Sequence, residues 1–359
     1  MAYTEIDNPE LYFQVELYTG TSGDGNAMTF DGSEDMQPDM IWVKSRGNAY
    51  HYVADSVRGV TKRIAPDRSD AETTTTDTLA SFDSDGFTLD DDATNNWINY
   101  SGTSYVAWCW KAGGSASSNS DGTNITSTVS ANTDAGFSIA SYTGSGTDSD
   151  TVGHGLGSAP KMIFLKKRDA LDSWYVMHTS LSANSALLLD GTSPEYGLGT
   201  LTYGVLSTSP TSSVFSFAAG AGAVPTGNVN NSSSTYITYC FAEKQGFSKF
   251  GSYVGNSSTD GTFVYTGFSP SFLMIKCTSG TEEWWTWDNK RDTYNVVDEA
   301  LHANDEDAVE VSDSLDFLSN GFKMRVNSGA RNATGTTYIY MAFAEAPFVN
   351  SNGVPCNAR

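Results

Sequence analysis

The chain has 359 residues, of which 42 are Asp or Glu and 20 are Lys or Arg, so its formal net charge is −22. This charge leaves no basic surface for nucleic acid and is repelled by anionic membrane surfaces. No apolar run reaches the length of a transmembrane helix, so we expect neither nucleic-acid binding nor membrane insertion. The acidity favours solubility, with cation binding or a salty environment as the alternative.

The N-terminal residues 1–7 lack the basic and apolar regions of a signal peptide. We therefore expect synthesis in a cytoplasm, with release by lysis.

Three sequence markers then recur in constant order along the chain. A proline, a short apolar run and a lysine appear at 38–44, 160–166 and 270–276. A Tyr-X-Gly segment precedes each copy, and a Tyr-led apolar segment follows it at 105–110, 236–241 and 338–343. A repeat of about 110 residues is long enough to bury its own core, so the markers predict three tandem units.

The repeat predicts these boundaries: unit 1 over 1–112, unit 2 over 124–243 and unit 3 over 244–359, with a short C-terminal tail. Residues 113–123 are rich in Gly and Ser, which predicts a flexible linker and a loose first junction. Units 2 and 3 follow each other without such a spacer, which predicts a stiff second junction.

Each unit has the pattern of short β-strands. The apolar segments have apolar residues on both alternating faces, as central strands covered on both sides do, and each repeated proline marks where strand pairing begins. Asp85-Gly86 and Asn320-Gly321 predict two-residue hairpins in which the glycine supplies a positive φ. Only residues 295–303 favour a helix. We predict an all-β fold: three tandem antiparallel β-sandwich-like repeats with very little helix.

Polar residues at repeated positions favour structural roles. Cys109 and Cys240 match each other in two units, which indicates small buried core residues and no disulfide. His154 lies in a glycine-rich turn that it is expected to cap, and His178 aligns with Asp55 and Asp288 at a strand end; a catalytic or ligand-binding role is the alternative for both histidines. The repeated lysines are expected to point into solvent, with a ligand role as the alternative: Lys44, Lys166 and Lys276.

No nucleophile-elbow, phosphate-loop or dinucleotide motif is present, so we predict no enzyme and no cofactor. The acidic segments 83–86 and 90–92 leave surface calcium open, although their spacing is not that of an EF-hand. One aromatic and acidic cluster is a candidate glycan contact, because Trp faces stack on sugar rings and carboxylates bind hydroxyls: Glu282, Glu283, Trp284, Trp285 and Trp287. The alternative is that these aromatics are core, since Trp285 aligns with Tyr52 and Tyr175.

Four segments resemble a family of marine bacteriophage virion proteins with a triplicated β-rich domain, described as structural or tail-fibre-like, and the resemblance extends over nearly the whole chain. These segments are 35–44, 152–163, 246–253 and 337–345. The resemblance implies a virion location, with other virion proteins as partners. It names no functional residue.

We therefore expect a tail fibre or receptor-binding appendage that contacts glycans or proteins of the host surface receptor. Tandem units would give length, and a homo-oligomer, with a trimer favoured, would add avidity. A capsid decoration or head-fibre protein is the alternative, and a polysaccharide depolymerase is less favoured. Recognition is expected in the segments that the repeats do not share: 45–50, 182–210 and 278–283.

Overall fold

Almost all regular structure in the computed structural model, which describes residues 4–197, 205–218 and 228–356, is antiparallel β-sheet. The prediction of an all-β fold is confirmed. In the described residues, helix is limited to a 3-10 turn η1 (Pro9–Leu11) and a short helix α1 (Gly329–Asn332).

Unit 1 consists of a four-stranded sheet and a small second sheet. The first has the order β1-β9-β3-β4 and the second β2-β8-β7, and β5 pairs with β6 apart from both. The strands are β1 (Phe13–Thr19), β2 (Asn26–Met28), β3 (Met40–Ser45), β4 (Tyr52–Asp55), β5 (Lys62–Arg63), β6 (Thr73–Thr74), β7 (Leu79–Asp83), β8 (Gly86–Leu89) and β9 (Ser104–Trp110).

Unit 2 repeats this order as β12-β20-β14-β15, with extra strands at both edges, and its small sheet is β13-β19-β18. Its strands are β10 (Ser117–Asn119), β11 (Ser127–Asn132), β12 (Phe137–Thr143), β13 (Thr151–Gly153), β14 (Met162–Lys167), β15 (Trp174–His178), β16 (Ser185–Leu188), β17 (Tyr196–Gly197), β18 (Val205–Leu206), β19 (Val214–Ala218) and β20 (Thr235–Phe241).

Unit 3 repeats the order again as β21-β28-β23-β24, and here both layers join into one eight-stranded sheet that continues as β25-β26-β27-β22. Its strands are β21 (Ser248–Val254), β22 (Phe263–Tyr265), β23 (Phe268–Cys277), β24 (Trp284–Asp288), β25 (Val297–His302), β26 (Glu310–Leu318), β27 (Gly321–Met324) and β28 (Thr337–Pro347).

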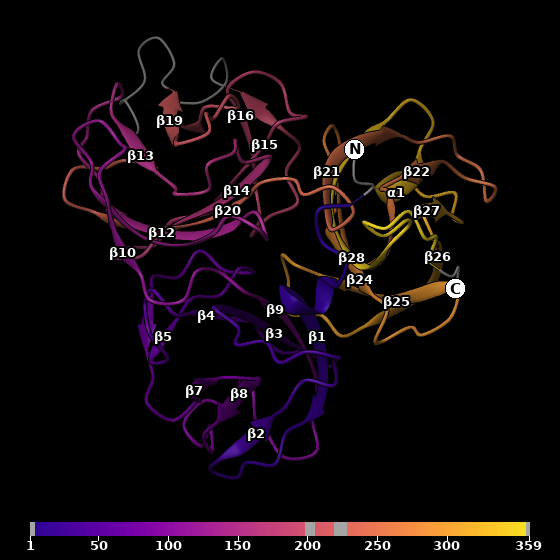
Figure 1. The fold of residues 1–359 in the computed structure, drawn as a ribbon, viewed down its shortest axis with the longest axis horizontal. Coiled ribbons are helices and arrows are strands. Elements are labelled where there is room, and N and C mark those ends of the chain that lie inside the picture. Colours follow the sequence, from indigo (N-terminus) through magenta and orange to yellow (C-terminus); the bar gives the residue numbers. More distant parts are fainter. Residues whose placement is uncertain (1–3, 198–204, 219–227, 357–359) are drawn as a thin grey trace.

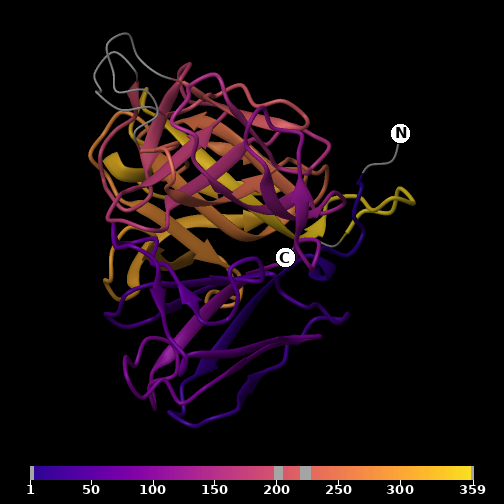
Figure 2. The ribbon, with the colours of Figure 1, turned by 90° about the vertical axis from the view of Figure 1, so that its left-hand side faces the viewer.

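The three units do not lie in a line. Figure 1, viewed along the shortest dimension, shows three lobes around a common centre, and the shared four-strand sheet of each lobe lies toward that centre. We call these the inner sheets, and the strands beyond them, such as β2, β7 and β8, the outer sheets. Figure 2 shows unit 1 below the other two units in the view from the side. Repetition therefore builds a three-lobed body.

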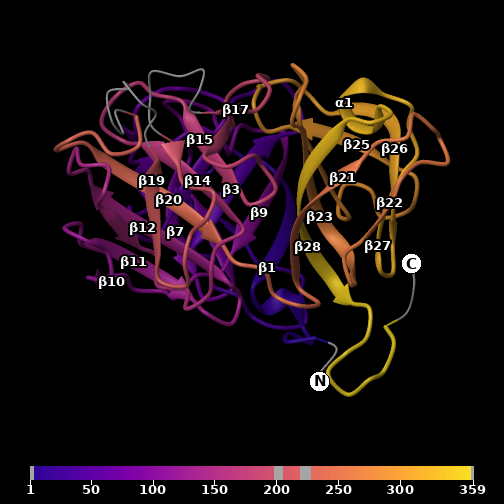
Figure 3. The ribbon, with the colours of Figure 1, turned by 90° about the horizontal axis from the view of Figure 1, so that it is seen from above.

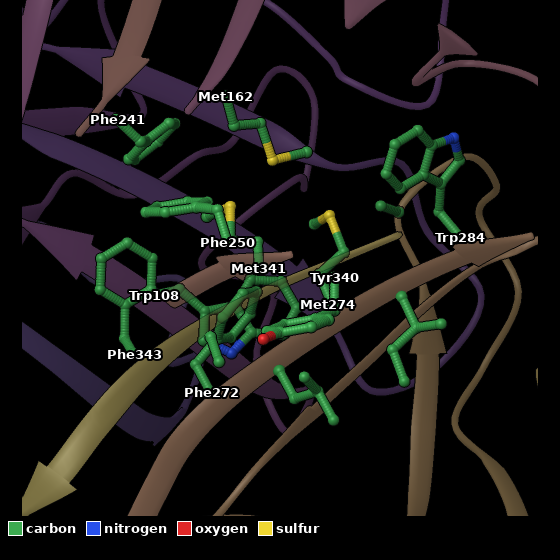
Figure 4. Close-up of a cluster of buried hydrophobic side chains, with 14 of the residues drawn as sticks. Trp108, Met162, Phe241, Phe250, Phe272, Met274, Trp284, Tyr340, Met341 and Phe343 are labelled. Atoms are coloured by element: carbon green, nitrogen blue, oxygen red, sulfur yellow. The ribbon is translucent and has the colours of Figure 1, made fainter. Parts of the chain in front are cut away.

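One hydrophobic core fills the centre and is shared by all three units (Figure 4). Trp110, Phe241 and Phe343 hold the same position in the three units, and their rings touch each other with centroids 5.7–6.2 Å apart. Units 1 and 2 also have a separate outer core each, between their two layers. The expectation that each unit buries its own core is thus incomplete.

The predicted linker over 113–123 does not form a loose junction. Its residues 117–119 are strand β10, which pairs with β11 in the sheet of unit 2. The backbone N–H of Gly113 donates to Ser130 Oγ at 3.0 Å, and that of Gly114 donates to Asp39 Oδ2 at 3.2 Å. The first junction is held by hydrogen bonds to both neighbouring units.

One local prediction is wrong and another holds in part. The segment expected to be helical, 295–303, contains strand β25, whose Val297 and Ala300 are buried between strands. Pro38 and Pro160 precede their strands, but Pro270 lies inside β23 at a register shift, where a missing N–H is tolerated.

The first and last described segments lie side by side, as Figure 3 shows near the N and C marks. The backbone N–H of Ser351 donates to Asp7 Oδ1 at 2.7 Å. The N–H of Glu5 donates to the carbonyl of Gln245 at 3.0 Å, so unit 3 also holds the start of unit 1.

Candidate functional site

The repeated lysines are buried at the boundaries between units, so the expectation that they point into solvent is wrong. Lys166 Nζ in unit 2 donates to the carbonyl of Ser69 in unit 1 at 2.9 Å. Lys44 donates in the same way to unit 3 and Lys276 to unit 2, at the carbonyls of Asp307 (2.8 Å) and Thr192 (3.1 Å). Burial lowers the pKa of each lysine from 10.5 to about 8.

Beside each lysine, at the start of the following strand, one side chain directs a ring nitrogen to a carbonyl of the same neighbouring unit. Trp174 Nε1 donates to Ala65 at 2.8 Å, and Trp284 Nε1 donates to Leu188 at 2.8 Å. In unit 1 the matching residue is His51, whose Nε2 lies 2.9 Å from the carbonyl of His302. Trp42 Nε1 donates to His51 Nδ1 at 2.7 Å, which leaves the proton of the neutral ring on Nε2.

A pair of backbone hydrogen bonds completes each boundary. Between units 1 and 2, the N–H of Glu72 donates to Arg168 and that of Asp172 to Ser69, at 2.8 and 2.9 Å. Between units 2 and 3, the N–H of Glu195 donates to Thr278 and that of Glu282 to Thr192. Between units 3 and 1, the N–H of Val309 donates to Arg46 and that of Ala49 to Glu306. We call this arrangement of lysine, ring N–H and backbone pair the inter-unit seam; it occurs at all three boundaries.

The aligned strand-end residues also contact neighbouring units. Asp55 accepts a hydrogen bond from Tyr239 of unit 2 at 2.7 Å, and Asp288 accepts one from Trp108 of unit 1 at 3.0 Å. His178 caps its own turn through Ser180 and places Nε2 3.3 Å from the carbonyl of Tyr340 in unit 3. The prediction of a polar strand-end position is confirmed, and the polar side chain at this position contacts a neighbouring unit.

The Tyr-X-Gly markers close the far end of each inner sheet. In each unit its tyrosine stacks on the tyrosine that leads β9, β20 or β28, with centroids 4.9–5.1 Å apart. A buried asparagine six residues before the second tyrosine accepts the N–H that follows the marker glycine, at 2.9–3.1 Å. These asparagines are Asn99, Asn230 and Asn332. Their constant spacing from the tyrosine was visible in the sequence and was missed.

The predicted glycan contact is wrong for its tryptophans, because all three are buried. Trp284 takes part in the seam, Trp287 is fully buried, and Trp285 lies between Trp287 and the guanidinium of Arg331, 3.8 Å from its ring centroid. Glu282 and Glu283 are half-buried; Glu283 accepts a hydrogen bond from Asn304, and Glu282 pairs through its backbone with unit 2. These residues are close together, as their adjacency in the sequence predicted, but the tryptophans lie in the protein interior.

Two of the carboxylates considered as calcium ligands, Asp83 and Asp92, accept hydrogen bonds from nearby residues. Asp83 accepts hydrogen bonds from Ser81 and Thr88, and Asp92 accepts the N–H groups of Ile98 and Asn99. Among residues 4–197, 205–218 and 228–356, no three His, Cys, Asp or Glu side chains gather as metal ligands would. The calcium hypothesis thus finds no donor cluster in the described part of the chain.

The remaining polar predictions concern His154 and two cysteines. His154 is buried, and its Nδ1 accepts the N–H of Leu156 at 3.2 Å, which confirms the turn-capping role. Cys109 and Cys240 are free and fully buried, as predicted.

A hollow of about 860 Å³ opens in unit 2, at the rim next to unit 1. Strands β15, β16 and β17 supply Tyr175, Leu188 and Tyr196, and the surrounding loops supply the remaining side chains of the lining: Ser69, Lys167, Leu171, Asp172, Ser173, Ser193, Pro194, Glu195, Asn228 and Asn231. Residues 193–196 belong to one of the segments in which recognition was expected; residues 198–204 of that segment lie outside the described residues. The hollow is a site that no sequence motif indicated.

Burial controls the ionisation of the hollow's acidic groups. It raises the pKa of the Asp172 carboxyl, although Tyr175 Oη and the N–H of Ser173 both donate to Asp172 Oδ1, at 3.0 and 2.9 Å. Asn228 donates in turn to Tyr175 Oη. Burial also raises the pKa of Tyr196, whose hydroxyl has no hydrogen-bond partner among the described residues. The hollow therefore has a fixed polar network of Asp172, Tyr175 and Asn228 in its wall.

Comparison with known proteins places the chain in one family. A model described as "Domain of unknown function (DUF7483)" matches residues 8–347. Neither a curated protein nor a solved structure matches the chain. Among the described residues no helix is long and apolar enough to span a membrane.

Proposed function

We propose that this chain, which belongs to the DUF7483 family, is a structural and binding protein of a bacteriophage virion, exposed on the particle as a receptor-binding appendage. Its partners would be other virion proteins and a receptor on the host surface, and it would not act as an enzyme.

The observation that carries the proposal is the closure of three β units around one core by three matching seams. Buried lysines, ring N–H groups and backbone pairs hold the units together, and the segments that differ between units take part in these seams through Ala49, Glu195 and Glu282. Other loops of each lobe face away from the common centre (Figure 1). A rigid body with several distinct loop surfaces suits display and attachment. Its acidity also disfavours unspecific adhesion to anionic surfaces.

The same closure favours a second candidate, a protein that decorates the capsid. Lobes arranged around a centre do not add length, as the units of a fibre shaft would, but they suit a body seated on a shell. Antibody labelling of intact virions separates the two candidates. Label at the tail supports the appendage, label on the capsid faces supports the decoration protein, and an unlabelled particle overturns both.

Adsorption tests the receptor-binding role directly. Purified protein is expected to bind host cells and to slow phage adsorption in proportion to its concentration. If the folded protein does neither, it is not a receptor-binding appendage. A homotrimer stays a prediction from the sequence, and light scattering would distinguish it from the single 38.5 kDa chain.

A further inference from the structure

We propose that the hollow of unit 2 binds a neutral saccharide. Only the biological source of the sugar, a host-surface glycan, rests on the proposed function; the binding itself rests on the geometry below.

The hollow lies in unit 2, and units 1 and 3 place different side chains near the matching position. Tyr175 holds the position of Tyr52 in unit 1 and Trp285 in unit 3, between the inner and outer layers. In unit 3 the guanidinium of Arg331 covers the Trp285 ring at 3.8 Å. In unit 1 that of Arg63 lies 3.9 Å over Trp97, which packs against the outer core. Units 1 and 3 thus each have an Arg–Trp pair, whereas in unit 2 Tyr175 lines the hollow.

The walls combine the two surfaces that sugars need. Tyr175, Tyr196, Leu188 and Leu171 present rings and aliphatic groups, suited to the C–H faces of a sugar ring. Leu171 is 72% exposed and adds an accessible apolar side chain to the lining. The volume, about 860 Å³, lies within the range of small-molecule sites and is enough for an oligosaccharide of a few units.

The polar groups are arranged to pair with hydroxyls. Both hydrogen bonds to the Asp172 carboxylate end on Oδ1, which leaves Oδ2 for a ligand hydroxyl. Tyr196 contributes its ring to the wall, because its hydroxyl is enclosed by protein atoms and has almost no exposed surface. Asn228 is already oriented by Tyr175. Such a network is preorganised for a polyhydroxylated ligand.

The charges of the lining favour a neutral sugar over an acidic one. Two carboxylates, Asp172 and Glu195, line the hollow with one lysine, Lys167. The chain as a whole carries a net charge of −22. A uronic acid or sulfated sugar would meet repulsion from both the lining and the surrounding surface.

The test is binding of the full chain to immobilised oligosaccharides, followed by calorimetry with the strongest binder. Neutral hexose and N-acetylhexosamine oligosaccharides form one arm, and uronic-acid and sulfated oligosaccharides form the other. We expect binding in the neutral arm. No binding in that arm, or stronger binding in the charged arm, overturns the proposal.

Variants then locate the site. Leu171→Ser changes an exposed side chain and is expected to weaken binding about three- to tenfold at an unchanged melting temperature, since roughly 1 kcal/mol of apolar contact is lost. Tyr196→Ala should weaken it more than tenfold. The matched control is Tyr294→Ala, which removes a tyrosine that is 83% exposed in unit 3 and should leave affinity unchanged.

If folded Leu171→Ser binds the sugar with the same affinity as the unaltered chain, the sugar binds outside the hollow and the assignment is overturned. If no sugar binds but the protein still blocks adsorption, the saccharide inference fails while the proposed function stands.

Discussion

Lys166 in unit 2 donates a hydrogen bond to the backbone carbonyl of Ser69 in unit 1, with 2.9 Å between Nζ and the oxygen. The two residues are 97 positions apart in the sequence. The repeated lysine thus ties each unit to its neighbour, which explains why a charged residue follows an apolar strand in all three units.

Replacing Lys166 by Met should destabilise the protein. The change removes the lysine donor from the carbonyls of Ser69 and Asp172, and only that of Ser69 keeps another, the backbone N–H of Asp172. A buried carbonyl that loses its partner costs about 1–3 kcal/mol. Urea unfolding followed by tryptophan fluorescence measures the loss. Lys161→Met, at an exposed lysine, is the control and should lie within about 0.5 kcal/mol of the unaltered chain. Equal stabilities of the two variants would contradict the role of the seam.

Glycine is required at both hairpins, for partly different reasons. A Cβ at Gly86 would lie 1.9 Å from the carbonyl oxygen of Met28, and one at Gly321 would lie 2.0 Å from that of Val264. Gly86 has φ of +102°, whereas Gly321 is outside the positive-φ region, so the predicted positive φ holds only for Gly86.

Gly321→Ala should therefore cost about 1–3 kcal/mol through overpacking, and Gly86→Ala should cost more because backbone strain is added. Thermal unfolding of both variants measures the difference. Gly47→Ala is the control, since its Cβ would meet nothing closer than 3.6 Å. The reverse order of the two melting temperatures would be inconsistent with this explanation.

Acid should weaken the protein partly through His178. Burial lowers the pKa of this histidine from 6.5 to about 4, so between these values the unfolded chain binds the proton and the folded chain does not. Stability from this group is complete above pH 6.5 and is lost as the pH falls toward 4, by up to roughly 3 kcal/mol.

His178→Gln should lose less stability than the unaltered chain between pH 6.5 and 4, as measured by unfolding at a series of pH values. Burial raises the pKa of Glu16 to about 7 and that of Asp67 to about 6, which acts in the opposite direction. Because both carboxyls are present in both proteins, the difference between the two curves isolates the histidine. Parallel curves would refute the assignment.

Residues 1–112 alone should not form a stable monomer. Separation from units 2 and 3 would expose Trp108 and Trp110, which are buried in the shared core. We expect aggregation or strong binding of an apolar dye, measured by size-exclusion chromatography and fluorescence, whereas the whole chain should unfold in one transition. A monomeric fragment with cooperative unfolding would show that the shared core is dispensable.

Prediction from sequence succeeded where the signal was local. The strands around residues 105–110 and their repeats are short segments with apolar residues on both faces, the hairpins contain Asp-Gly and Asn-Gly, and the cysteines match between units. It failed for Trp284 and Trp285, because an aromatic residue beside a carboxylate has the same local pattern in a core as at a surface. The hollow of unit 2 was not predictable, since residues as far apart in the sequence as Ser69 and Asn231 line it and meet only after folding.

The sequence by itself determined that the chain is β-structured and triplicated, because strand pattern and repeat depend on neighbouring residues. Only the tertiary structure decided that the three units close around one core. The lysine hydrogen bonds of the seams join residues 84 to 263 positions apart and end on backbone carbonyls, which every residue possesses and no sequence pattern distinguishes.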